Sequence, residues 1–433
     1  MKTYTVALIG AGSRGTGYTN IMKDCPEKFK VVAVAEPIKG RREAIAERHD
    51  IPAEMCFPGW EEMLAQPKLA DVVLICTMDE MHYEPALKAI DLGYDILLEK
   101  PAAQTAQECV DIAVAAEKKG VKVLVCHVLR YAPFFKQVKT LLMDGVIGDV
   151  MSMIHVEAVG NVHQSHSYVR GNWHDANATT PMLLAKSCHD IDIIQWLLDK
   201  PCKKVTSFGD LTYFTKENAP EGAPKRCFDG GCPIEDTCPY NCRKLYYDDK
   251  DNSWFRRACT RGIAAKEDPT DEEVVTALQT TDYGLCVFQA NNNVVDHQVV
   301  NMEFEGGVTV SFSMNCFNKG GRFIRIFGTK GELTAYAKEG DIKIYSYEDK
   351  EFHTVSLSAS NESITSGHGG GDAGIVNELY EYLDGSYNGF CAADINVSAK
   401  NHLIGFAAEK ARENGTVEDI DTFFNEYGFE NKY

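Results

Sequence analysis

The sequence predicts an α/β protein of two domains, on three observations. The first half alternates short apolar strands with helices, a glycine-rich turn follows the first strand, and the second half contains a series of strands without helices between them. Strands rich in Val, Ile and Leu that alternate with helices form a parallel sheet, whereas successive strands pair antiparallel. The 433 residues suffice for two or three domains of about 150 residues each.

The first half accounts for the parallel sheet. Its strands carry runs such as the apolar residues 72–76, which are hydrophobic at every position because both faces of such a sheet are buried. We place the first domain at residues 1–130. Its strands are expected at 5–10, 30–36, 71–77, 94–99 and 121–127, and its helices at 16–24, at 40–49, after Met81 and at 105–119.

The pattern changes after residue 131, and we assign residues 131–433 to a second α/β domain with a large, mainly antiparallel sheet. A polar, histidine-rich loop at 160–180 precedes a predicted helix at 182–198, and a segment rich in Cys, Pro and Gly interrupts the domain at 218–242. The other predicted elements are strands 150–158, 203–214, 282–290, 293–304, 307–316, 321–328, 331–336 and 341–347, and helices 134–143, 374–384 and 396–413.

Composition argues against several classes of partner. The chain has 63 acidic and 44 basic residues and a net charge of −19, which repels phosphate backbones and anionic lipids. No apolar run approaches the roughly 18 residues of a membrane span, and the first ten residues do not resemble a signal peptide. We expect no nucleic-acid or membrane partner, and a cytoplasmic location in which the 15 cysteines stay reduced.

A dinucleotide-binding turn follows the first strand, where residues 10–15 match G-x-G-x-x-G. The glycines allow a tight turn and let the backbone approach a pyrophosphate, and the following helix offers its N-terminal amides to that anion. Glu36 ends the second strand, where a carboxylate accepts hydrogen bonds from the ribose of NAD. These features predict a Rossmann domain that prefers NAD, although basic residues between 39 and 42 leave NADP open.

Two further motifs produce a family resemblance. Glu99, Lys100 and Pro101 stand at the end of the predicted strand 94–99, at the carboxyl edge where such sheets place ligands. His189 and Asp192 form a His-x-x-Asp pattern in the predicted helix 182–198. With the glycine turn, these motifs make the whole chain resemble the glucose-fructose oxidoreductase/inositol dehydrogenase (Gfo/Idh/MocA) family. The resemblance implies a second domain whose open sheet mediates oligomerisation, here as a homodimer or homotetramer.

The resemblance also implies chemical roles. The family places the lysine of Glu-Lys-Pro between nicotinamide and substrate, so Lys100 would orient a substrate hydroxyl. Oxidation of a carbinol requires a base for the hydroxyl proton, and His189 would supply it. The family typically has Asp four residues before this histidine, but here Ala185 stands there, which makes Lys186 a candidate replacement. The alternatives are a core histidine at 189 and a solvated lysine at 186.

The polar loop adds candidate substrate contacts. Residues 163–174 combine histidines, an arginine and aromatic rings, a mixture suited to polyols, although a surface loop with incidental histidines is an alternative. The candidate substrate residues are His127, Arg130, His163, His166, Arg170, Trp173, Lys186 and His189. The candidate cofactor residues are Gly10, Gly12, Ser13, Arg14, Gly15, Glu36, Thr77, Glu99 and Lys100.

Four cysteines cluster in the interrupting segment. Cys227, Cys232, Cys238 and Cys242 fall within sixteen residues, and four thiolates on short loops suit a tetrahedral structural zinc ion. Their spacing differs from paired C-x-x-C knuckles, so free thiols are the alternative.

These features predict an NAD-dependent oxidoreductase that acts on a secondary hydroxyl of a sugar, glycoside, sugar acid or cyclitol. A second hypothesis is an NAD-dependent glycosidase that works by transient oxidation, elimination, water addition and re-reduction, because Ala185 departs from the usual pattern. A third hypothesis, a cofactor-binding sensor without turnover, is disfavoured by the presence of Lys100 and His189.

Overall fold

The N-terminal domain is a parallel sheet between two layers of helices. The computed structural model describes residues 2–248, 254–266, 268–357 and 367–431. Six parallel strands lie in the order β3-β2-β1-β4-β5-β6, the order of a dinucleotide-binding Rossmann sheet, so this prediction is confirmed. The strands are β1 (Tyr4–Ile9), β2 (Phe29–Ala35), β3 (Cys56–Phe57), β4 (Val72–Ile75), β5 (Asp95–Leu98) and β6 (Val123–Val125). The helices are α1 (Ser13–Lys23), α2 (Lys39–His49), α3 (Trp60–Leu64), α4 (Tyr83–Asp91) and α5 (Ala106–Lys119).

The second domain is built on a nine-stranded sheet in the order β14-β13-β12-β11-β7-β10-β9-β8-β15. β7 and β10 are parallel and the other neighbouring strands are antiparallel, as predicted for a mainly antiparallel sheet. Along β9, residues alternate strictly between buried and exposed, so one face of the sheet packs on the core and the other is open. The strands are β7 (Val150–Ala158), β8 (Cys202–Asp210), β9 (His297–Phe304), β10 (Val308–Asn315), β11 (Gly321–Gly328), β12 (Gly331–Tyr336), β13 (Asp341–Ser346), β14 (Phe352–Ser356) and β15 (Glu418–Asp419).

The helix predicted at 182–198 is broken. α8 (Met182–Ala185) and α9 (Cys188–Leu198) are separated by Lys186 and Ser187, which form a corner. The other helices of this domain are α6 (Pro133–Met143), α7 (Asn161–His163), α13 (Ile395–Asn414) and α14 (Ile420–Glu426).

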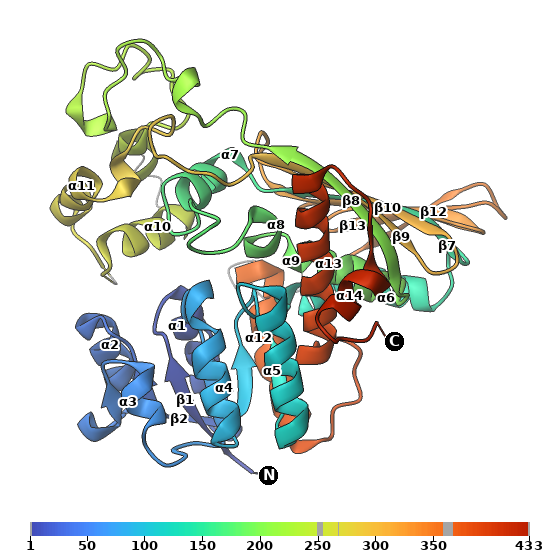
Figure 1. The fold of residues 1–433 in the computed structure, drawn as a ribbon, viewed down its shortest axis with the longest axis horizontal. Helices are drawn as coiled ribbons and strands as arrows, with labels where there is room; N and C mark the ends of the chain where they lie inside the picture. The colour runs from blue at the N-terminus through green and yellow to red at the C-terminus, as the bar shows by residue number, and fades with distance from the viewer. Residues whose placement is uncertain (1, 249–253, 267, 358–366, 432–433) are drawn as a thin grey trace.

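A long excursion, residues 211–296, connects β8 with β9 and stands away from the sheet (Figure 1). It contains α10 (Trp254–Ala264) and α11 (Asp271–Thr280), and has a small core of its own around Cys242, Tyr246 and Leu278. The strand predicted at 282–290 is wrong, because residues 282–284 form a short 3₁₀ turn and the apolar residues that follow, Leu285, Val287 and Phe288, join the main hydrophobic core from outside any strand.

The end of the chain returns to the first domain. α12 (Gly371–Asp384) packs on α1, and the Val125 amide of β6 donates a 2.9 Å hydrogen bond to the Ala393 carbonyl. The two domains therefore share an interface that includes segments far apart in the sequence, as Figure 1 shows for α12 beside the first sheet. Among the described residues, no helix has the length and apolarity needed to cross a membrane.

Candidate active site

The glycine turn has the geometry that a bound pyrophosphate requires. Gly10 has φ +89°, and a Cβ there would lie 2.6 Å from the Cys76 carbonyl oxygen. A Cβ on Gly15 would lie 2.1 Å from the Gly10 carbonyl oxygen, so the strand and α1 could not pack as closely. A Cβ on Gly12 would meet no atom within 4 Å, which leaves open space where α1 begins at Ser13. The turn therefore fits a dinucleotide phosphate at the N-terminus of α1.

Glu36 lies beside this turn at the end of β2. It is 4% exposed, and its carboxylate accepts hydrogen bonds from the amides of Ala11 at 2.7 Å and Ile38 at 3.0 Å. Arg42 donates to the Glu36 carbonyl oxygen, and Lys39 pairs with its helix neighbour Glu43 on the solvated side of α2. The anionic carboxylate is thus fixed where the ribose of a dinucleotide would lie.

Arg14 and Glu99 have partners of their own. The Arg14 guanidinium donates to Glu99 at 2.8 Å and to both carboxylate oxygens of Asp372 at 2.8 Å, and Tyr18 also donates to Glu99. Burial alone would raise the pKa of Glu99, but Arg14 and Lys100 hold it below its usual value. These contacts tie β5, α1 and α12 together.

Thr77 also has a local partner, because its hydroxyl donates to the Met81 carbonyl oxygen at 2.8 Å. It lies just after β4, at the carboxyl edge of the sheet that also carries the glycine turn and Lys100.

Lys100 reaches from the first domain to the second. It follows β5, and its ammonium group donates a 2.8 Å hydrogen bond to the Ala185 carbonyl oxygen at the end of α8. This is the position where the family typically has Asp, so a backbone oxygen now stands in place of that side chain beside the lysine. The ammonium has three protons and this bond uses one, which leaves donors for another oxygen atom.

Lys186 occupies the corner between α8 and α9, and its side chain is 16% exposed. Its ammonium nitrogen lies 3.5 Å from Glu157 of β7, and the same carboxylate is 2.8 Å from the Arg322 guanidinium. Burial lowers the pKa of Lys186; Glu157 opposes this effect, and Arg322 and Lys100 add to it. Lys186 is therefore easier to deprotonate than a solvated lysine. This environment argues against the alternative that Lys186 is an ordinary solvated lysine.

A second buried carboxylate supports the start of α9. Asp190 accepts a 2.8 Å hydrogen bond from His155 of β7 and another from Arg322. Burial would raise the pKa of Asp190, but Arg322 and His155 hold it well below its usual range. Neither Arg322 nor His155 stood out in the sequence, because each lies in an ordinary strand and its partners are distant in the chain.

His189 is the second residue of α9 and is 4% exposed. Its ring packs edge-to-face on His127, with ring centroids 6.3 Å apart. His127 is fully buried, with Nε2 2.9 Å from the Ser398 hydroxyl, and Arg130 makes a bidentate ion pair with Asp192 at 2.8 and 2.6 Å. His127 and Arg130 were predicted at the rim of a substrate site, but the structure places both inside, where they brace α9.

The predicted substrate loop divides into two parts. His163 lies near Lys186 and Lys100: burial lowers its pKa far below the usual value, and these two cations lower it further. The Trp173 indole donates to Asp79, just after β4, at 3.0 Å. His166, in contrast, stacks on Tyr283 of the excursion with ring centroids 4.9 Å apart.

Arg170 is also turned toward the excursion, which corrects its predicted substrate role. It is 2% exposed, and its guanidinium donates to the carbonyl oxygens of Leu285 at 2.7 Å and Tyr240 at 2.6 Å. Both acceptors belong to the excursion, so Arg170 joins the loop to it.

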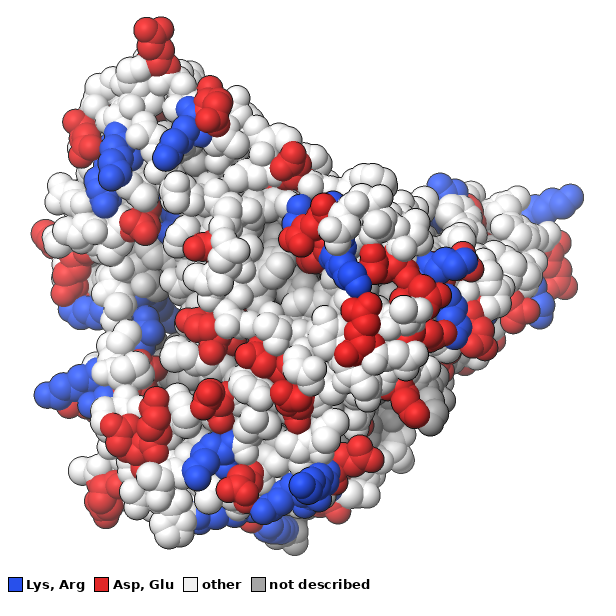
Figure 2. All heavy atoms as spheres, in the orientation of Figure 1, with Lys and Arg blue, Asp and Glu red and all other residues white. Residues whose placement is uncertain are grey.

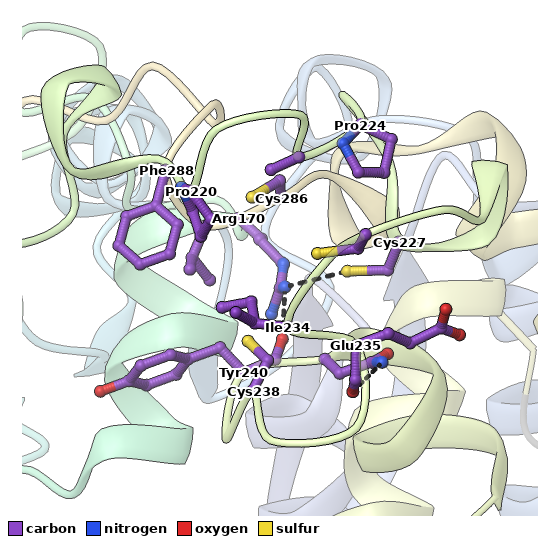
Figure 3. A pocket seen from close by; sticks show the side chains of 14 residues that line it. Arg170, Pro220, Pro224, Cys227, Ile234, Glu235, Cys238, Tyr240, Cys286 and Phe288 are labelled. Atoms are coloured by element: carbon purple, nitrogen blue, oxygen red, sulfur yellow. Dashed lines mark hydrogen bonds between the residues drawn. The ribbon is translucent and has the colours of Figure 1, made fainter.

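The four-thiol zinc ion is not supported. Throughout the ranges that the structure describes, no group of three or more His, Cys, Asp or Glu residues is placed to hold a metal ion. Cys227, Cys238 and Cys286 line a pocket that the Arg170 side chain enters (Figure 3). A guanidinium among the thiols repels a second cation and instead favours a thiolate, and the sequence pattern could not show that Arg170 comes to this place.

The chain matches a known oxidoreductase family over most of its length. The family domain described as "Oxidoreductase family, NAD-binding Rossmann fold" matches residues 4–127, and "Oxidoreductase family, C-terminal alpha/beta domain" matches residues 139–394. YteT of Bacillus subtilis, named as an oxidoreductase, is 25% identical over 338 residues, 76% of each chain.

Two other relatives match over about half of their length. A 2,7-anhydro-N-acetylneuraminate hydratase of Mediterraneibacter gnavus is 29% identical over 209 residues, which cover 48% of this chain and 53% of the relative. An inositol 2-dehydrogenase/D-chiro-inositol 3-dehydrogenase of Lactiplantibacillus plantarum is 24% identical over 205 residues, 47% of this chain and 55% of the relative.

Solved structures share the complete fold. The crystal structure of an oxidoreductase from Agrobacterium radiobacter in complex with NAD⁺, L-tartaric acid and magnesium superposes with a TM-score of 0.69 and 14% identity, over 97% of this chain and 99% of that one. Because the two family domains match residues 4–127 and 139–394, this chain belongs to the Gfo/Idh/MocA oxidoreductase family.

Proposed function

We propose that the protein is an NAD-dependent oxidoreductase that oxidises a secondary hydroxyl group of a sugar, glycoside, sugar acid or cyclitol. The observation that carries this proposal is the bond from Lys100 to the Ala185 carbonyl oxygen. It brings the cation at the carboxyl edge of the Rossmann sheet next to α9, which begins with Cys188 and His189. The cation and the imidazole come from different domains, and we infer that both face the position of a nicotinamide ring at the carboxyl edge of the Rossmann sheet.

The two residues divide the proton chemistry. Lys100 would donate a hydrogen bond to the substrate oxygen and hold it against the imidazole, and His189 would accept the proton as the C–O bond becomes C=O. NAD, when bound along residues 10–15 and Glu36, supplies the acceptor for the hydride from the same carbon. His163 and Trp173 would contact the remaining hydroxyl groups of the substrate.

The experiment is a screen of sugars, sugar acids and cyclitols with NAD, in which the formation of NADH is followed by its absorbance. Turnover that depends on NAD and disappears in Lys100→Ala supports the proposal. A protein that binds NAD tightly, forms no NADH with any compound of the screen and leaves the mass of every compound unchanged would support the sensor hypothesis instead.

A redox-assisted elimination is the second candidate, and Lys186 favours it. Cleavage or hydration after transient oxidation needs a further base that removes a proton from the carbon beside the carbonyl, and then a proton donor for the return. Burial lowers the pKa of Lys186 beside Glu157, which suits a lysine to both steps. The relative from Mediterraneibacter gnavus is named as a hydratase, and the addition of water is one step of this second reaction.

The two candidates differ in the fate of the cofactor and of one substrate proton. The oxidoreductase accumulates NADH in proportion to product. The elimination recycles the cofactor and incorporates one deuterium atom at carbon when the reaction runs in D₂O. Product mass in D₂O and NADH yield, measured together, separate them.

We further propose that NAD is preferred over NADP and that the open sheet face joins copies of the chain as a homodimer or homotetramer. The Glu36 carboxylate would repel a 2′-phosphate. On the open face, Phe208 and Val299 are paired on adjacent strands and are 63% and 41% exposed. Titration with both cofactors tests the first statement; light scattering of wild type and Phe208→Lys tests the second, with a smaller assembly expected for the variant.

A further inference from the structure

The pocket in the excursion places a thiol pair next to a buried cation. Cys227 packs against the small core that contains Cys242, and the Arg170 guanidinium lies 3.9 Å from the Cys227 sulfur, as Figure 3 shows for Arg170 and Cys227. Cys242 is fully buried, whereas Cys227 is partly exposed. The proposed oxidoreductase chemistry uses none of these three residues.

The charge of Arg170 is incompletely balanced by its other contacts. Its Nε and Nη2 atoms donate to backbone carbonyl oxygens, which carry only partial charge, and Nη1 has no hydrogen-bond partner among the described residues. A buried guanidinium without a carboxylate partner favours an anion nearby. Among the described side chains that line this pocket, the Cys227 thiol is the one in hydrogen-bond contact with Arg170; the Tyr240 contact is to a backbone carbonyl oxygen.

The two thiols are therefore not equivalent. The hydrogen bond from Cys242 and the charge of Arg170 lower the pKa of Cys227 to about 6, although burial opposes them. The same contact with Cys227, together with burial, raises the pKa of Cys242 above its usual range. The Cys227 sulfur is thus favoured as a thiolate at neutral pH, whereas Cys242 remains a thiol, and its sulfur lies 3.8 Å from the Gly284 carbonyl oxygen.

The size of the pocket limits what can reach the pair. Its cavity volume is about 30 Å³, with Cys232, Cys238 and Ile234 along the wall. This space holds one or two molecules of the size of water and excludes a sugar or nucleotide. A small oxidant can enter, and an organic ligand cannot.

We propose that Cys227 is an oxidation site at which hydrogen peroxide drives formation of a reversible disulfide bond with Cys242. The Cys227 thiolate attacks one peroxide oxygen, the O–O bond breaks, and the sulfenic acid and hydroxide form; hydroxide takes a proton from solvent. The Cys242 sulfur then attacks the Cys227 sulfur, the S–O bond breaks and a second water leaves. Two thiols lose two electrons, and one peroxide is reduced to two waters.

The disulfide removes the anion beside Arg170, and the loop that carries Arg170 also carries His163 and Trp173. Oxidation therefore weakens the attachment of residues 161–173 to the excursion, and these residues exchange amide hydrogens faster. This readout requires no substrate, so it stands whether or not the proposed oxidoreductase activity is correct.

The experiment maps thiol oxidation in the full chain with NAD present. Protein freed of reductant is treated with one equivalent of hydrogen peroxide, blocked with iodoacetamide, digested without reduction and analysed by mass spectrometry. The expected product is a Cys227–Cys242 disulfide that dithiothreitol reverses. Before oxidation, iodoacetamide at pH 6 should label Cys227 about tenfold faster than a cysteine in an unstructured peptide. About half of Cys227 is then a thiolate, and this gain exceeds the loss of nucleophilicity that accompanies its lower pKa.

Two variants keep the test independent of folding effects. In Cys242→Ser, Cys227 should stop at the sulfenic acid, which dimedone traps; in the matched control Cys232→Ser, which changes another thiol of the same pocket, the disulfide should form as in wild type. Oxidation of Cys25 or Cys56 ahead of Cys227, a Cys232–Cys238 disulfide, or one tightly bound zinc ion per chain with thiols that peroxide leaves unchanged would each overturn the proposal.

Discussion

The domain junction and the excursion both contain a buried or half-buried cation, histidines and polar loop residues, yet they use them differently. At the junction, Lys100 makes one bond to a backbone oxygen and keeps donors for a further partner. In the excursion, Arg170 has two carbonyl acceptors and a thiol around it. The two cations differ in exposure, because Lys100 is partly exposed whereas Arg170 is 2% exposed, so the Lys100 ammonium is open to a ligand and the Arg170 guanidinium is enclosed by the protein.

The two histidines of the same loop show the same division. His163 lies near Lys100 and Lys186, whereas His166 is held by Tyr246 at 2.9 Å and by the ring of Tyr283. They are three positions apart in sequence, but they contact different parts of the structure. Figure 2 shows acidic side chains on this face both over the excursion and over the first domain.

The largest difference between the regions should appear in turnover. Lys100→Ala or His189→Ala should lower kcat by about 10² to 10⁴, because each removes acid–base assistance, while NAD affinity measured by calorimetry stays nearly unchanged. Lys68→Ala is the matched control, since Lys68 donates to the Gly93 carbonyl oxygen at the opposite end of the same sheet. Wild-type turnover in both site variants on an identified substrate would remove these residues from the chemistry.

The excursion should respond in stability. Arg170→Met leaves the Leu285 and Tyr240 carbonyl oxygens without their charged donor, which should lower the free energy of unfolding by about 3 to 5 kcal/mol. Urea unfolding measures this change. Arg243→Met, in the exposed part of the excursion beside Asp248, should change it by less than about 0.5 kcal/mol. A small effect at Arg170 would show that the loop is anchored by other contacts.

Burial of His166 in the folded protein should make the free energy of unfolding depend on pH. Burial, followed by the charge of Arg170, lowers the pKa of His166 to about 4. The unfolded chain binds a proton near pH 6.5 and the folded chain does not, so stability falls as pH drops from 6.5 toward 4, by up to about 2 kcal/mol at pH 5, and is unaffected above that window.

Unfolding of wild type and His166→Gln at pH 7 and pH 5 tests this sign, and the variant should lose less stability on acidification. His353→Gln is the control, because His353 is half exposed beside Asp349. Equal acid sensitivity of His166→Gln and wild type would contradict the assignment.

The smallest effect is expected at the cofactor end of the junction. Glu36→Gln removes the anion beside the ribose position and should reduce the preference for NAD over NADP by about tenfold, without unfolding the protein. Glu43→Gln, on the solvated face of α2, should leave the preference unchanged. Titration with both cofactors decides, and tighter binding of NADP by wild type would reverse the proposal.

Local patterns allowed much of the fold to be predicted. The strands at 321–328 and 331–336 begin and end where predicted, because alternation and buried runs depend on neighbouring residues. The five predicted Rossmann strands agree to within two residues, whereas the two-residue strand β3 was not predicted. Two helices of the excursion were missed, although Thr270 and Glu273 form a capping box that signals the start of α11. The helix break at Lys186 had no such signal.

The sequence by itself determined the parallel sheet, the glycine turn, the position of Lys100 at a strand end and the family, because each depends on residues within one short segment. The tertiary structure alone decided that Ala185 offers its backbone oxygen to Lys100, that Asp372 and Arg14 join the chain ends, and that Arg170 enters a thiol pocket. These contacts join residues up to 358 positions apart. A side chain's partner is set by how the elements pack, and the local spacing that predicts an element carries no record of that packing.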